Sequence, residues 1–268
     1  MTMATTMHPG GSGSGNPALS DKVVDQYLVP VADTRSMTVA GTAVKTLVLL
    51  VVLVLAGAYG WSAATTGTAS DAGGGYATTT VTFPPGLWLA SLGALFVGIA
   101  CSVNPRRAAV LGLVYAALEG YVLGAVSAAF DAQTDGIVGA AVLSTVSVFV
   151  AALFLYMTRI VKPTARLAFG VAAGIGGLCL LYLFVWVLAI FDWSWLYSDQ
   201  FRTIGIGVSL LAVVLAALSL TLDFGAVEGG VQAGAPKFME WYLAFSLTVT
   251  LVWLYITLLR LLALLNRS

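Results

Sequence analysis

The sequence predicts an all-α integral membrane protein built as a bundle of seven transmembrane helices. Of the 268 residues, 59% are hydrophobic and only 9% are charged, with a mean hydropathy of +0.96. A soluble domain needs a far more charged surface. Seven apolar runs also approach the roughly 20 residues that a helix needs to cross the hydrocarbon core. They cover residues 43–61, 86–103, 108–130, 136–158, 165–191, 203–223 and 241–264.

The chain divides into a tail and a membrane domain. Residues 1–40 include the low-complexity stretch HPGGSGSGNP and show no sustained apolar period, which is typical of a flexible segment. We expect residues 1–40 to form a cytoplasmic N-terminal tail. Residues 41–268 are expected to form the seven-span domain.

The boundaries of the spans carry the expected breakers and anchors. A proline lacks a backbone N–H and is harmless between helices. Prolines fall between the runs at Pro84, Pro85, Pro105, Pro163 and Pro236. The fifth run is long for one crossing, and aromatic residues typical of a membrane interface lie at and just after its end. These are Trp186, Trp193, Trp195 and Tyr197.

Lys and Arg predict the orientation, because cytoplasmic loops are enriched in them. One side of the predicted topology holds nine, namely Lys22, Arg35, Lys45, Arg106, Arg107, Arg159, Lys162, Arg166 and Lys237, and the opposite loops hold Arg202. The N-terminus is therefore expected in the cytoplasm of a multi-pass protein of the cell membrane. Arg260 and Arg267 oppose this pattern. Either the last segment crosses with snorkelling arginines, which we favour and which places the C-terminus outside, or it does not fully cross.

Glu119 lies halfway along the third span, within GLVYAALEGYVLGAVSAAF. A charge at mid-bilayer costs about 2.5–3.5 kcal/mol on insertion scales, so it is expected to face the bundle interior. Small residues recur there every fourth position and predict a close helix–helix contact. This ridge is Gly112, Ala116, Gly120, Gly124 and Ala128. Two interpretations of Glu119 stay open: a hydrogen bond to a neighbouring helix at this contact, or a role in ion or proton passage.

Asp223 and Glu228 end an otherwise uncharged run, at the predicted cytoplasmic end of the sixth span. Five residues correspond to about 140° around a helix, so the two share a face only if the helix breaks. The following GAVEGGVQAGAPKFMEW, with its four glycines and a proline, predicts such a break. Together with Glu240 the pair supplies oxygen ligands suited to Ca²⁺, with Asp223 and Glu228 as the metal ligands. The alternative is a solvated interfacial loop with Lys237 as counter-ion.

Several classes of chemistry are not expected. The single histidine, His8, lies in the tail, away from any membrane site. There is no Walker loop, and no strand is expected before a glycine-rich stretch. Cys101 and Cys179 lie in apolar runs and are interpreted as core residues. The zero net charge gives no indication of nucleic acid. We therefore expect no enzyme activity and no cofactor.

Three longer stretches resemble the Bax inhibitor-1-like family (the transmembrane Bax inhibitor motif family) in a bacterial branch. They are NPRR, GLVYAALEGYVLGAVSAAF and LTLDFGAVEGGVQAGAPKFMEWYLAFSLTVTLVWLYITLLRLLALL. The resemblance implies a bundle with the last helix central and a calcium leak governed by pH. It also implies a proton-sensitive pair of aspartates in the sixth and last spans, with an arginine of the second span as a latch. Asp223 matches the first aspartate, Thr250 stands at the second, and residues 86–103 contain no arginine.

Two functions follow from these observations. The first is a pH-sensitive leak channel or exchanger for calcium or other cations, with calcium ions or protons as its partners. Because Thr250 cannot carry charge, Glu119, Glu228 or Glu240 must then take the missing role. We expect Asp223 at the inner mouth and Glu119 as the deeper carboxylate, with flux varying between about pH 5 and 8. The alternative is a non-transporting protein that regulates stress responses or membrane quality control through other membrane proteins.

Overall fold

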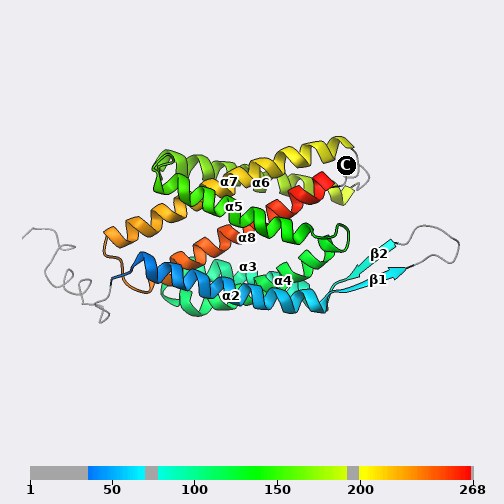
Figure 1. The fold of residues 1–268 in the computed structure, drawn as a ribbon, viewed down its shortest axis with the longest axis horizontal. Helices are drawn as coiled ribbons and strands as arrows, with labels where there is room; N and C mark the ends of the chain where they lie inside the picture. The colour runs from blue at the N-terminus through cyan, green and yellow to red at the C-terminus, as the bar shows by residue number, and fades with distance from the viewer. Residues whose placement is uncertain (1–35, 70–77, 192–198, 267–268) are drawn as a thin grey trace, which may run out of the picture. The chain divides into compact units, whose positions relative to one another are not determined.

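The computed structural model describes residues 36–69, 78–191 and 199–266, and the account of the fold concerns these residues. Seven α-helices of 17 residues or more lie in this part of the chain, one for each predicted span (Figure 1). They are α2 (Val39–Ala63), α3 (Leu87–Val103), α4 (Ala108–Asp131), α5 (Ile137–Met157), α6 (Ala165–Phe191), α7 (Asp199–Gln232) and α8 (Met239–Asn266). A short 3₁₀ turn, η2 (Pro105–Arg107), precedes α4. Six of these helices are long and apolar enough to cross a membrane. The seventh, α3, is also apolar but has only 17 residues.

A β-hairpin between α2 and α3 was not predicted. Strand β1 (Thr65–Ala69) pairs antiparallel with β2 (Thr78–Thr82), with Thr65 opposite Thr82. The strands read TTGTA and TTTVT, and such β-branched residues favour extended structure. The expectation that no strand precedes a glycine-rich stretch is therefore wrong. A second strand, rather than a helix, follows this stretch, so the arrangement is not that of a phosphate-binding loop.

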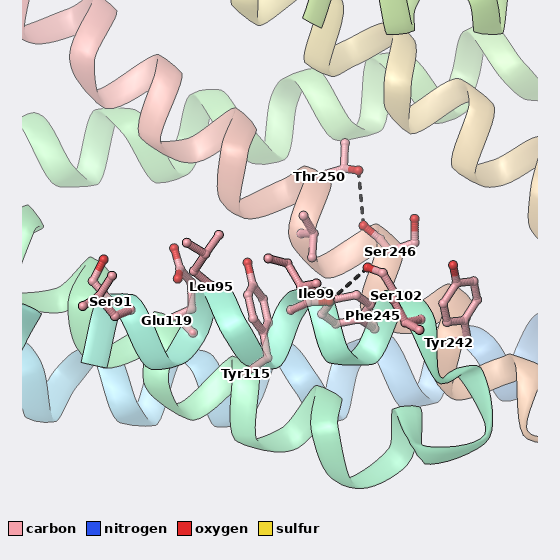
Figure 2. A pocket seen from close by; sticks show the side chains of 15 residues that line it. Ser91, Leu95, Ile99, Ser102, Tyr115, Glu119, Tyr242, Phe245, Ser246 and Thr250 are labelled. Atoms are coloured by element: carbon pink, nitrogen blue, oxygen red, sulfur yellow. Dashed lines mark hydrogen bonds between the residues drawn. The ribbon is translucent and has the colours of Figure 1, made fainter. Parts of the chain in front are cut away.

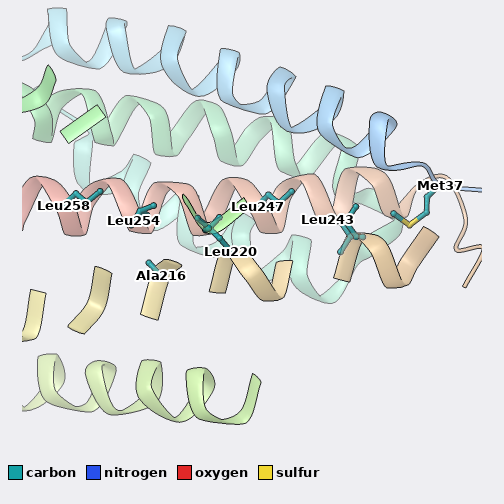
Figure 3. Close-up of a cluster of buried hydrophobic side chains, with 9 residues drawn as sticks. Met37, Ala216, Leu220, Leu243, Leu247, Leu254 and Leu258 are labelled. Carbon is teal, nitrogen blue, oxygen red and sulfur yellow. The ribbon is translucent and has the colours of Figure 1, made fainter. Parts of the chain in front are cut away.

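Helix α8 packs against four others, α2, α4, α5 and α7. Half of its most apolar stretch is buried, compared with 11% for α6. Its buried leucines recur at helical spacing and belong to one hydrophobic cluster with Leu220 of α7 (Figure 3). These leucines are Leu243, Leu247, Leu254 and Leu258. Inside a membrane such contacts act mainly through close van der Waals packing.

The predicted ridge of small residues on α4 is confirmed as a close helix crossing. It packs against α2, where Gly57 and Gly60 provide the matching small residues. A Cβ added at Gly120 would overlap the carbonyl of Leu53, and one at Gly124 would overlap the carbonyl of Gly57. The two backbones therefore touch at a distance that only glycine allows.

The predicted break after Asp223 is wrong, because α7 continues without interruption to Gln232. Each helical glycine costs about 1 kcal/mol relative to alanine, but here two of them make room for other segments. A Cβ at Gly225 would lie 2.6 Å from Pro163, and one at Gly230 would lie 2.7 Å from the sulfur of Met37. The helix ends later, where Gly234 has a φ of +65°. There the Ala235 N–H bonds to the Gly230 carbonyl and the Gly234 N–H to the Val231 carbonyl, as in a Schellman cap.

Candidate functional site

Asp223 of α7 is held by two hydroxyl groups of α8. The Ser246 Oγ donates to its Oδ1 at 2.8 Å, and the Thr250 Oγ1 donates to its Oδ2 at 2.7 Å. Ser246 and Thr250 are four residues apart, so they share one face of α8. Each carboxylate oxygen thus receives one hydroxyl donor. Positions 223 and 250, which the resemblance pairs, are in direct contact.

Asp223 lies well inside α7 and not at its end. The helix continues from residue 223 to residue 232, nine positions or about 13 Å. On α8, Thr250 lies eleven positions after Met239, or about 16 Å. The helix that carries Asp223 therefore continues beyond the predicted end of the sixth span at residue 223. Gly225 and Gly230, which have Pro163 and Met37 as close neighbours, lie in this continued part of the helix.

A cavity of about 680 Å³ lies between α3, α4 and α8 (Figure 2). Its polar lining comes from all three helices: Ser91 and Ser102 of α3, Tyr115 and Glu119 of α4, and Tyr242, Ser246 and Thr250 of α8. Ser246 and Thr250 thus both line the cavity and bond to Asp223 through their hydroxyl groups. The α3 residues that line it run from Ser91 to Val103, which corresponds to about 18 Å along the helix.

Glu119 lies on the wall of this cavity and is half-buried. Within the described part of the chain it has no hydrogen-bond partner. The interpretation that it bonds a neighbouring helix at the glycine contact is therefore wrong, because Gly120 contacts α2 while Glu119 lines the space between α3 and α8. Figure 2 shows both Glu119 and Thr250 at this cavity.

Glu240 is buried and already paired. Its carboxylate forms an ion pair with Lys45 of α2, and its Oε1 accepts hydrogen bonds from the Thr38 N–H at 2.9 Å and the Thr38 hydroxyl at 3.2 Å. The Lys237 Nζ lies 3.8 Å from the same oxygen. Thr38 is also the N-cap of α2, with its hydroxyl accepting from the Gly41 N–H. Glu240 therefore joins the beginning of α2 to the beginning of α8.

Glu228 has a separate set of partners at the end of α5. Its carboxylate accepts a hydrogen bond from the Tyr156 hydroxyl and pairs with the Arg159 guanidinium at 3.2 Å, and Gln232 donates to it at 3.1 Å. Because α7 is continuous, Asp223 and Glu228 point about 140° apart. Among the described residues, no three acidic, histidine or cysteine side chains gather closely enough to hold a metal ion. The structure thus does not bring Asp223, Glu228 and Glu240 together.

Sequence reasoning missed the hydroxyl groups of the site. Ser246 could have been found from its i, i+4 spacing to Thr250, and Ser91 and Ser102 carry no comparable signal.

Arg260 of α8 is also accommodated in an unexpected way, with its guanidinium 5.0 Å from the centroid of the Tyr182 ring of α6. A cation over an aromatic face is stabilised without an acidic partner.

Comparison with protein-family models matches residues 11–267 to the family described as Bax inhibitor 1 like. The match covers nearly the whole chain. A search of curated proteins found no match.

Proposed function

Since the chain belongs to the Bax inhibitor 1 like family, we propose that it is a pH-sensitive leak channel or exchanger for calcium or other cations. Asp223 is the ion-binding carboxylate in this proposal. The observation that carries it is the contact of Asp223 with Ser246 and Thr250, which also line the cavity beside Glu119. The hydroxyl groups of Ser246 and Thr250 would then lie between a cation in the cavity and the carboxylate of Asp223.

The chemistry of the hydroxyl groups supports this path. A hydroxyl has one donor and two acceptor lone pairs, so Ser246 and Thr250 can donate to Asp223 and still offer oxygen to a cation. Calcium takes six to eight oxygen ligands and accepts water among them. The protein oxygens of this site are too few for a closed calcium cage, so the ion keeps part of its water shell. Such partial dehydration suits passage better than tight binding.

The sensitivity to pH belongs to Glu119 in this proposal. Thr250 cannot titrate, so a second titratable group near Asp223 has to come from elsewhere on the cavity wall. Glu119 is the carboxylate that lines the cavity, whereas Glu228 and Glu240 are engaged by Arg159 and Lys45. Protonation of Glu119 would remove one of the two negative charges that attract a cation into the cavity.

We propose the following topology. All seven helices cross the cell membrane, with α8 central, the N-terminus cytoplasmic and the C-terminus outside. The contacts of α8 with four helices support its central place, and the position of Arg260 over Tyr182 supports a crossing that keeps an arginine near the outer end. A 17-residue α3 is short for a crossing, and local thinning of the bilayer accommodates such a helix. We also propose that the protein is not an enzyme and uses no cofactor.

A second candidate is a non-transporting membrane protein that regulates stress responses or quality control through other membrane proteins. The observation that favours it is the hydroxyl of Thr250 where the resemblance places a second carboxylate. Calcium flux into liposomes that contain this protein alone separates the two candidates. Flux above that of empty liposomes supports the leak, and its absence at every pH supports the second candidate.

A further inference from the structure

The cavity at Glu119 is open along its side. Helix α3 packs against α4 through one face, where Ala94 and Cys101 are buried. Its other face lines the cavity and remains uncovered, with Leu95 56% exposed and Ile99 54% exposed. No contact between α3 and α8 comparable to that between α3 and α4 occurs within the described residues. The space between α3 and α8 is therefore a cleft that faces the surrounding bilayer.

The cleft combines an apolar rim with a polar interior. Leu92, Leu95 and Ile99 form the rim on α3, and the carboxylate of Glu119 lies on the α4 wall. Glu119 has neither a hydrogen-bond partner nor an ion-pair partner among the described residues, so none of them compensates its charge. A carboxylate in a water-poor site is strongly stabilised by a cationic donor.

We propose that this cleft binds a single-chain amphipathic amine that enters sideways from the bilayer. The ammonium group pairs with Glu119, and the alkyl chain lies along Leu92, Leu95 and Ile99. The apolar rim favours the chain and the carboxylate favours a cationic head over a neutral or anionic one. The volume of about 680 Å³ lies within the usual range for sites that hold small organic ligands. This inference uses the cavity of the proposed function but does not require transport.

The first test measures binding of radiolabelled dodecylamine to the full chain in nanodiscs of phosphatidylcholine, with empty nanodiscs as the blank. Glu119→Gln should weaken binding about tenfold or more, because it replaces a charge-assisted hydrogen bond by a neutral one. Glu228→Gln is the matched control, since it makes the same chemical change at a carboxylate of α7 that does not line the cleft. Dodecanol, with the same chain and no charge, should not displace the amine.

Equal binding by the wild type and Glu119→Gln, equal loss in both variants, or equal displacement by dodecanol would each overturn the proposal. A second measurement locates the ligand without altering Glu119. In a Cys179→Ser background, Ile99→Cys should be labelled by N-phenylmaleimide and protected by dodecylamine. Phe96→Cys, which is 66% exposed on α3 but outside the cleft, should be labelled without protection. Equal protection at both positions would show general partitioning into the lipid and refute the site. Because neither assay uses an ion gradient, amine binding and calcium flux can succeed or fail separately.

Discussion

Gly120→Ala should destabilise the bundle, whereas Gly177→Ala should not. The added Cβ at Gly120 would lie 2.9 Å from both the carbonyl carbon and the Cα of Leu53, and ordinary contact begins at about 3.4 Å. The carbonyl oxygen of Leu53 would lie closer still, so the backbones of α2 and α4 must separate by about 1 Å. A gap of 0.5–1 Å forfeits about a quarter to a half of the attraction between each pair of atoms along the crossing.

The expected magnitude follows from two opposing terms. Overpacking of a tight contact costs about 1–3 kcal/mol, while replacing a helical glycine by alanine contributes about 1 kcal/mol of helix propensity. At Gly120 the net effect is a loss of up to about 2 kcal/mol. At Gly177 of α6 nothing lies within 4 Å of an added Cβ, so only the gain of about 1 kcal/mol remains. The changes in stability caused by the two variants should thus have opposite signs.

Thermal unfolding in one detergent, followed by tryptophan fluorescence at a fixed scan rate, compares the two variants with the wild type. Gly120→Ala should melt below the wild type, and Gly177→Ala should melt at or above it. Indistinguishable melting temperatures for the two variants would refute the argument that α2 and α4 meet through their backbones. A loss at Gly177 equal to that at Gly120 would do the same.

Four further predictions concern the charges and the tail. Glu119→Gln should flatten the change in calcium flux between about pH 5 and 8 while leaving the protein folded. A wild-type pH profile of the flux in liposomes would contradict the role of Glu119 as the pH-sensitive group. Asp223→Asn should change the flux at every pH by removing the ion ligand, so unchanged flux at all pH values argues against that ligand. Lys45→Met leaves Glu240 buried without its main cation and should lower the stability of the bundle by about 3 kcal/mol. The double variant Lys45→Met with Glu240→Gln should recover part of this loss, and thermal unfolding measures both. Removal of residues 1–36 should leave the melting temperature of the bundle nearly unchanged, and a marked drop would show that the tail contributes to folding.

Hydropathy alone predicted the helices, because every crossing segment must be apolar along its whole length and satisfy its own backbone. The ridge around Gly120 was also predictable, since its four-residue spacing is local. The partner of the ridge was not, because Gly57 and Gly60 show their role only once α2 lies against α4. The continuation of α7 was missed for the same reason. Pro163 and Met37, which fill the space beside its glycines, are distant in sequence.

The candidate site was predictable only in part. The match of Asp223 and Thr250 came from the resemblance, and the structure brings the two residues into contact. The ion pair of Glu240 with Lys45 joins residues 195 positions apart, so no local pattern indicated it. The cavity depends on which face of α3 stays uncovered, and an almost uniformly apolar helix does not reveal its packed face in the sequence.

The partners of each acidic residue indicate which of them can serve a cation. Glu228 and Glu240 are engaged by positively charged side chains, so an incoming ion would have to compete with a cation already in place. Asp223 is held by hydroxyl groups, which keep free lone pairs and add no positive charge. Glu119 has neither kind of partner among the described residues and lies on the wall of an open cleft. Within the proposed function, local electrostatics therefore favour Asp223 and Glu119 as the acids that serve a cation, while Glu228 and Glu240 hold helices together through their ion pairs.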